Sequence, residues 1–178
     1  MQYIPENFKQ ELNNELKDRE HVAWSTRPNS FYSILSATPA FLFGIPWNAF
    51  LLFMHDKQLG KNESIYLDVF VLPFYLVGLY LFLTPVIEWR KARKTLYVIT
   101  NLRAFSLKLG QSVIVESFYP KSIGNIEKTV RSNGSGNLIL ARDHHIDSDG
   151  DKKVTDYGFF ALPNVIEAEK QLDKLLEQ

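Results

Sequence analysis

Hydrophobic positions are concentrated in two long stretches of the chain that contain no charged side chain. Residues 28–54 and residues 69–87 lack Asp, Glu, Lys and Arg, although charged residues make up 22% of the whole chain. A helix of about 20 apolar residues is long enough to cross a bilayer whose hydrocarbon core is roughly 30 Å thick. The pattern therefore predicts a transmembrane hairpin, with one helix over residues 31–54 and a second over residues 69–89.

The second stretch is the more uniform of the two. Pro73 lies in about the first turn of the predicted helix, where a missing backbone N–H has little effect, and Pro85 lies near its end. Trp89 follows at the boundary. An indole ring is amphipathic enough to favour the headgroup level, so Trp89 is the expected membrane-interface anchor.

The first stretch is interrupted by residues that break or distort helices, namely Pro39, Gly44 and Pro46, and it also contains Asn48. Such interruptions are tolerated in a membrane where a neighbouring helix satisfies the freed polar groups. We expect a kinked transmembrane helix with the second helix as that neighbour. A re-entrant or interfacial segment is the alternative here. For both stretches together, the alternative is a helical pair buried inside a soluble protein.

The cations flanking these stretches predict the orientation of the hairpin. The loop over residues 55–68 contains only Lys57 and Lys61 as cations. The residues after the second stretch include a dense cluster: Arg90, Lys91, Arg93 and Lys94. The positive-inside rule then places both termini in the cytoplasm and the loop outside, in a multi-pass protein of the cytoplasmic membrane. The same four residues are candidate contacts for anionic lipid headgroups. A topology anchor without headgroup specificity is the alternative.

From Leu96 onward, hydrophobic and polar positions alternate with a period of two, which is typical of half-buried antiparallel strands. We expect Phe105 and Leu107 to lie on one face of a strand, and Ile126 and Val130 to point inward. Residues 143–153, which we call the polar excursion, are a polar segment that leads to the last strand. The predicted strands lie in these segments: "LYVIT", "RAFSLKL", "SVIVESFY", "IGNIEKTVR", "NLILAR" and "VTDYGFFAL". "SNGSG" between the fourth and fifth is a turn signal.

The chain ends in a predicted amphipathic helix over about residues 164–177. Asn164 is a plausible N-cap, with Glu167 three residues later. The apolar side chains of this helix fall on one stripe: Val165, Ala168, Leu172, Leu175 and Leu176. We expect this stripe to cover one end of the sheet, so that residues 94–178 form a single β-rich domain closed by the helix.

The N-terminal segment, residues 1–30, contains a short alternating stretch from His21 to Thr26. Val22 and Trp24 alternate with polar neighbours, as in an edge strand. We expect this stretch to dock on the domain formed by residues 94–178, with Trp24 partly buried. A free linker with Trp24 in the lipid headgroups is the alternative.

Several of these segments resemble bacterial PH-like (pleckstrin-homology-like) membrane proteins. The similarity lies in "EHVAWSTRP" before the apolar pair, in "RKTLYVITNLRAFSL" after it, and in "NGSGNLIL" and "FFALPNVIEAEKQL". The resemblance implies an α+β membrane protein whose two-helix hairpin is followed by a cytoplasmic PH-like antiparallel β-barrel or sandwich with a C-terminal capping helix. It implies no catalytic residues.

Motifs for chemistry are scarce. The chain has no Cys, which excludes disulfides and thiolate chemistry, and its net charge is zero, which gives no reason to expect a nucleic-acid partner. His144 and His145 are adjacent, and we expect them to lie in a solvated loop. On a strand they would point to opposite faces and would not readily bind one metal ion together. "DSDGDKKVTDYG" carries Asp at three calcium-ligand positions, but Lys152 and Gly158 replace the required Gly and Glu. We therefore expect no catalytic residue, metal or cofactor.

These observations predict a non-enzymatic, membrane-anchored module that presents a surface for protein binding or self-association at the cytoplasmic face. The expected partners are the lipid bilayer and another protein or a second copy. Two alternatives remain: an accessory subunit of a membrane transport or envelope-stress complex, and a module that binds anionic lipid.

Overall fold

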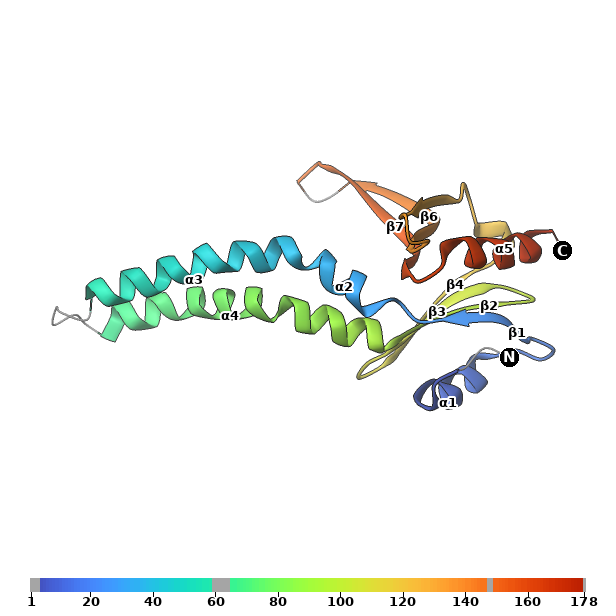
Figure 1. Ribbon diagram of the computed structural model, residues 1–178, viewed down its shortest axis with the longest axis horizontal. Helices are drawn as coiled ribbons and strands as arrows, with labels where there is room; N and C mark the ends of the chain where they lie inside the picture. The colour runs from blue at the N-terminus through green and yellow to red at the C-terminus, as the bar shows by residue number, and fades with distance from the viewer. Residues whose placement is uncertain (1–3, 59–64, 147–148, 178) are drawn as a thin grey trace. The chain divides into compact units, whose positions relative to one another are not determined.

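A computed structural model of the chain describes residues 4–58, 65–146 and 149–177 (Figure 1). The chain divides into two compact units. One is helical and comprises Ser30–Arg90, and the other combines Met1–Asn29 with Lys91–Gln178. The helical unit therefore interrupts the sequence of the second one, which we call the sheet unit.

The helical unit contains α2 (Ser30–Ser36), α3 (Thr38–Gln58) and most of α4 (Ile65–Arg93). Among the described residues, one helical segment, Phe70–Arg93, is by itself long and apolar enough to cross a membrane. Ser30–Ser36 and Thr38–His55 reach that length only together, and they bend by 49° at the break between them. Pro39 lies in the first turn of α3, and it has no backbone N–H to donate to the Leu35 carbonyl oxygen, which accounts for the break at Ala37.

Helices α3 and α4 pack closely around two glycines. Asn48 Nδ2 donates hydrogen bonds to the carbonyl oxygens of Gly44 (2.7 Å) and Gly78 (3.2 Å). A Cβ atom on Gly78 would lie 2.3 Å from Asn48 Oδ1, and one on Gly44 would lie 2.9 Å from Leu81 Cβ. Absence of a side chain at these positions lets the helices approach. The side chain of Asn48 therefore finds one of its two partners on α4, the helix that the sequence suggests as the neighbour.

The remaining surface of the helical unit is strongly apolar. In the most apolar part of Phe70–Arg93, with a mean hydropathy of 2.1, only 11% of the residues are buried. Large exposed side chains occur on both long helices, among them Phe43, Phe50, Phe53, Phe70, Leu79 and Tyr80. This is unlike a core helix of a soluble protein, which would be mostly buried.

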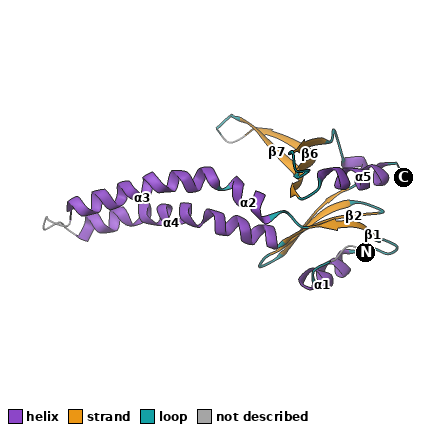
Figure 2. Ribbon diagram, viewed as in Figure 1, coloured by secondary structure: helices purple, strands orange, loops and turns teal. Residues whose placement is uncertain are grey.

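The sheet unit contains two antiparallel sheets (Figure 2). The first has the order β1-β2-β3-β4 and is built from β1 (Val22–Thr26), β2 (Thr95–Thr100), β3 (Ala104–Leu109) and β4 (Val113–Phe118). The second has the order β5-β6-β7 and is built from β5 (Glu127–Val130), β6 (Gly136–Ile146) and β7 (Lys152–Leu162). The short 3₁₀ helix η1 (Pro120–Ser122) lies between them, and the chain also forms α1 (Glu6–Glu15) and α5 (Val165–Leu176). The predicted α+β class with antiparallel sheets is confirmed at this level.

Both faces of the first sheet are covered, so β2 is buried along its whole length. On one face, Leu96, Val98, Phe105 and Leu107 pack against Phe8 and Leu12 of α1. On the other face, Tyr97 and Ile99 join the second sheet and the apolar stripe of α5 in the larger core. Figure 1 shows α1 and α5 on opposite sides of the first sheet. Helix α1 is missing from the sequence-based prediction, since residues 1–30 were assigned only the short stretch at His21–Thr26.

Three details of the sheet unit correct the sequence-based expectations. Val130 is 42% exposed, because β5 is a short edge strand and all four of its residues face solvent. Leu176 is 37% exposed, because it lies in the last turn of α5 beside the buried Leu175. The predicted polar excursion is mostly strand, since β6 continues to Ile146 and β7 begins at Lys152.

Candidate interaction site

The cationic residues predicted from sequence lie at the end of α4. Arg90, Lys91 and Arg93 belong to its last turn, Lys94 follows it, and all four are exposed, as is Trp89. The Lys91 carbonyl oxygen accepts hydrogen bonds from the Lys94 N–H (3.0 Å) and from Thr95 Oγ1 (2.9 Å). These bonds use a carbonyl group that the helix end leaves open, and they direct the chain into β2. Contact of these residues with headgroups stays a prediction.

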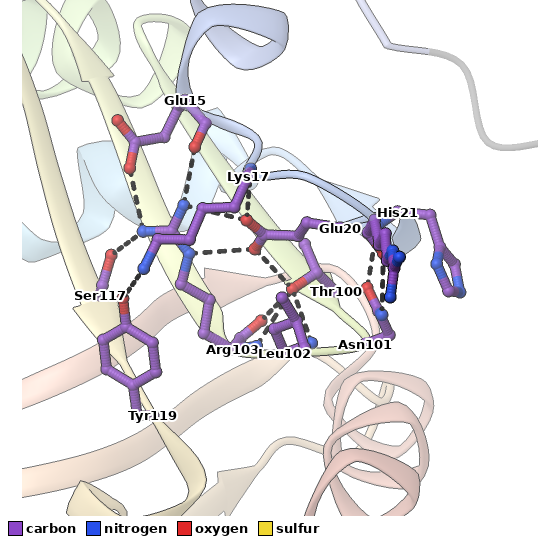
Figure 3. A network of polar contacts seen from close by, with 11 residues as sticks. Glu15, Lys17, Glu20, His21, Thr100, Asn101, Leu102, Arg103, Ser117 and Tyr119 are labelled. Carbon is purple, nitrogen blue, oxygen red and sulfur yellow. Dashed lines mark hydrogen bonds and ion pairs between the residues drawn. The ribbon is translucent and has the colours of Figure 1, made fainter.

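A buried ionic network joins the N-terminal segment to the sheet (Figure 3). Its centre is Arg103, which lies between β2 and β3 with 3% of its side chain exposed. Arg103 Nε donates to Glu20 Oε1 (3.0 Å), and Nη1 donates to Glu15 Oε1 (2.9 Å) and to Ser117 Oγ (2.8 Å). Nη2 donates to the Glu15 carbonyl oxygen (2.8 Å) at the end of α1. One guanidinium group therefore binds α1, the segment before β1, and β4.

Glu20 is the buried anion of this network, with no exposed side-chain surface. Its Oε1 accepts a hydrogen bond from Thr100 Oγ1 (2.8 Å), and its Oε2 accepts one from the Lys17 N–H (2.9 Å). Burial by itself raises the pKa of Glu20, but the hydrogen bonds from Arg103, Lys17 and Thr100 outweigh it and hold the pKa below its ordinary value. Glu20 is therefore ionised at neutral pH.

The network ends beside β1 and holds this strand on the sheet. The His21 N–H donates to Asn101 Oδ1 (2.8 Å), and Asn101 Nδ2 donates to the Arg19 carbonyl oxygen (3.2 Å) (Figure 3). Beyond His21, β1 pairs with β2 from Val22↔Thr100 to Thr26↔Tyr97. The docking of this stretch agrees with the sequence-based expectation, and Trp24, at 3% exposed, is buried more deeply than expected.

A groove of about 410 Å³ follows β1, which is an edge strand paired only with β2 among the described strands. Described residues that line it are Ile4, the consecutive residues Val22, Ala23, Trp24 and Ser25, and Glu167 and Gln171 of α5. Successive side chains of a strand point to opposite faces of its sheet. Four consecutive residues therefore line one groove only along the edge of the strand, and of these Ala23 is exposed whereas Trp24 and Ser25 are buried.

Two features of the groove bear on what it can bind. Ala23 is exposed and has no partner in the β1–β2 register, because a bulge separates Val22 from Trp24. The carboxylate of Glu167 makes no ion pair with another described residue, whereas Glu169 on the same helix binds Lys128 (2.6 Å). The groove therefore combines an exposed position of an edge strand, Ala23, with a negative charge on Glu167 that has no ion-pair partner among the described residues. The local sequence pattern predicts the strand but not the groove, because α5 begins 139 residues after the end of β1.

The His and Asp residues considered as metal ligands do not form a metal site in the described part of the chain. No group of three or more His, Asp or Glu side chains there could hold a metal ion. Asp149 and Asp151 are exposed, and Asp147 lies outside the described residues. His144 and His145 lie on β6, opposite Val154 and Lys153, so their assignment to a loop is wrong.

Comparisons of the chain with models of protein families, with curated proteins and with solved structures find no match.

Proposed function

We propose that this chain is a non-enzymatic membrane protein whose helical unit anchors a PH-like module at the cytoplasmic face, where the module binds another protein or a second copy. The observation that carries the proposal is the groove beside the edge strand β1, which is lined by the exposed residue Ala23 and by Glu167 and Gln171 of α5. Strand edges and grooves between a sheet and a helix are places where segments of other chains commonly bind.

The apolar surface of the helical unit supports the anchoring role. We infer that α4 is one transmembrane helix and that α2 and α3 together form a second, broken one, with residues 55–68 outside. Exposed Phe and Leu side chains favour lipid contact, and the exposed cations Arg90, Lys91, Arg93 and Lys94 favour the cytoplasmic side. Broken helices are tolerated in membranes where their polar groups find partners, as Asn48 does here.

The order of the strands supports a PH-like fold for the sheet unit. The unit has a sheet of four antiparallel strands, then a sheet of three, and then a helix that packs on the core. This order agrees with the arrangement implied by the resemblance in sequence. In this interpretation the membrane hairpin is an insertion between the first two strands, since β1 precedes it and β2 follows it.

The alternative role as an accessory subunit has less support. Asn48 gave a reason to expect neighbouring transmembrane helices, but its amide nitrogen donates within the hairpin, to Gly44 and Gly78. Recognition of anionic lipid by the four cations would act alongside protein binding. Their neutralisation to Gln should weaken binding to vesicles containing anionic lipid and reduce its salt dependence.

Two experiments test the proposal. Reporters fused at residue 62 and at Gln178 should lie on opposite sides of the membrane, and the chain should resist extraction with carbonate. A photocrosslinking amino acid at Ala23 should give a discrete adduct in intact membranes, whereas the same amino acid at Val113 on the other edge strand, β4, should not. Extraction by carbonate would contradict the anchoring role, and equal crosslinking from both positions would contradict the role of the β1 groove.

A further inference from the structure

A pocket of about 430 Å³ lies between α3 and α4, the two long helices of the helical unit (Figure 1). This volume is within the roughly 300–1,000 Å³ that is usual for ligand sites. Along the described part of its wall, three apolar residues come from positions 50–54 of α3 and four from positions 70–74 of α4. His55 and Tyr75 complete this lining. The pocket is therefore apolar along most of its wall and offers polar groups at one place.

The two polar side chains of the pocket lie against each other. The ring centroids of His55 and Tyr75 are 6.3 Å apart, and the rings meet edge to face at an angle of 83°. Among the described residues, neither side chain has a hydrogen-bond partner. Where lipid replaces water, leaving such groups without a partner is costly. The pocket therefore favours an occupant that brings hydrogen-bonding atoms to His55 and Tyr75.

The place of the pocket in the chain matches the depth of a phospholipid, given the anchoring role and the orientation proposed above. Residues 55–68 are outside in that orientation, so His55 lies at the outer boundary of the hydrocarbon core and the apolar part of the pocket extends inward from it. A phospholipid has ester oxygens at this boundary and acyl chains beneath it. The Tyr75 hydroxyl and an N–H of the His55 imidazole can donate to those ester oxygens.

Burial of apolar surface by itself would not retain a lipid in the pocket. Acyl chains of the surrounding bilayer are as apolar as the pocket wall, so transfer from one to the other gains little. A preference for the pocket comes from the concave wall, which contacts a chain on several sides, and from hydrogen bonds at His55 and Tyr75. The hairpin of a second copy would supply few such bonds, because the large exposed side chains of its long helices are mainly Phe and Leu.

We propose that this pocket holds one acyl chain of a phospholipid, whose ester oxygens accept hydrogen bonds from Tyr75 and His55. The apolar residues of α3 and α4 enclose the chain, and the two polar side chains fix its depth. The hairpin then carries a bound lipid in the outer half of the membrane.

The test uses the purified full-length protein in detergent, with small and increasing amounts of a photoactivatable probe. The first probe is a phosphatidylcholine with a diazirine in one acyl chain. The second is an alkane of equal chain length that has the same diazirine and no polar group. Intact-mass spectrometry counts the adducts, and sequencing of the labelled peptides locates them. The phosphatidylcholine should give a saturable adduct of one lipid per chain, located within residues 50–55 and 70–75.

Two pairs of matched variants make this result specific to the pocket. Val71→Phe fills the pocket and should remove the saturable adduct of both probes, whereas Val77→Phe, at an exposed position of α4 outside the lining, should leave it unchanged. Tyr75→Phe should weaken capture of the phosphatidylcholine about fivefold, as expected for one lost hydrogen bond, and should not change capture of the alkane. Tyr80→Phe, at an exposed position outside the lining, should affect neither probe.

Three results would overturn this inference. Adducts spread evenly along α3 and α4 without saturation would show only general contact with lipid. Equal weakening of both probes by Tyr75→Phe would show that the hydroxyl supports the helices and binds no ester. A chain-to-chain adduct from a photocrosslinking amino acid at Met54, undiminished by added phosphatidylcholine, would make a second copy the occupant. None of these results changes the carbonate resistance or the photocrosslink at Ala23 expected above, so failure here and failure of the proposed function remain distinguishable.

Discussion

The helical unit and the sheet unit differ in how they accommodate polar side chains away from water. In the helical unit, a neutral amide, Asn48, donates to two backbone carbonyl groups, one on its own helix and one on the neighbouring helix. In the sheet unit, a full charge on Arg103 is buried against two carboxylates, Glu15 at the end of α1 and Glu20 in the segment before β1. A neutral group needs only backbone partners, whereas a buried charge needs an opposite charge within reach.

The two units therefore differ in how strongly the stability of each depends on a single polar side chain. Asn48 contributes to a contact between two adjacent helices that also pack through their glycines and aromatic rings. Arg103 is the only side chain of the network in Figure 3 that binds α1, the segment before β1 and β4 together. We therefore expect the sheet unit to depend on one residue far more than the helical unit does.

The largest effect is expected from Arg103→Met, which leaves Glu20 buried without its cation. Removing one partner of a buried ion pair costs about 3–5 kcal/mol of stability. The measurement is denaturant unfolding in detergent, followed by fluorescence of a protein that retains Trp24 as its one indole. Lys108→Met, which breaks the exposed pair with Glu116, is the control and should cost less than about 1 kcal/mol. Similar losses for the two variants would contradict the central role of Arg103.

Acidification should weaken the same network. The pKa of Glu20 is lowered in the folded protein. Its contribution to stability is therefore complete above the pKa of the unfolded chain and is lost as pH falls through the lower, folded value. Unfolding of the protein that retains Trp24 alone, measured from pH 7 down to pH 3, should show this loss. Glu20→Gln should lower the free energy of unfolding at pH 7 and should make it less dependent on pH below pH 5. An unchanged pH profile in that variant would show that other carboxylates cause the acid sensitivity.

A smaller effect, confined to the helical unit, is expected from Gly78→Ala. The added methyl group would lie 2.3 Å from Asn48 Oδ1, so either the Asn48 amide leaves the Gly78 carbonyl oxygen or the helices move apart, and overpacking of this kind costs about 1–3 kcal/mol. Fluorescence of a protein that retains only Trp47, whose Nε1 donates to the Phe74 carbonyl oxygen, should report the change. Gly124→Ala, where a Cβ meets nothing within 4 Å, is the control. A response from Trp24 rather than Trp47 would show that the two units are not independent.

The smallest effect is expected at the start of α5. Asn164 Oδ1 accepts a hydrogen bond from the Glu167 N–H (3.2 Å), and loss of an N-cap costs about 1 kcal/mol. Asn164→Ala should therefore lower the stability of the sheet unit by that amount, whereas Asn164→Asp, which can still accept the bond, should lower it less. Equal losses in the two variants would indicate that the cap contributes little, and that packing of Leu172 and Leu175 on the core determines whether α5 forms.

Local patterns were sufficient to predict most elements of the sheet unit. The alternation of Phe105 and Leu107 with Ser106 predicted β3, and Asn164 predicted the first residue of the last helix. The same patterns did not predict α1, because Phe8 and Leu12 are isolated apolar residues in a polar segment. They also misplaced Val130, since its position in a short edge strand depends on which strands flank it.

The candidate site was predictable only in part, for a similar reason. The stretch from His21 to Thr26 could be assigned as an edge strand, because its alternation is local. The groove beside it requires α5, and the network that holds it requires Arg103, and both are remote in sequence. A lone Arg in a turn gives no signal of burial in a single sequence, because its carboxylate partners are more than 80 residues away.

The sequence by itself determined the properties that depend on composition and short-range period. These are two stretches without charges, a change to period two at Leu96 and an amphipathic helix at the C-terminus, since each depends on neighbouring residues and on the geometry of one helix or strand. Only the tertiary structure decided which face of each strand is covered, which charges are paired, and that a groove forms between β1 and α5. Those outcomes depend on contacts between remote segments, whose free energy arises only when the segments are packed together.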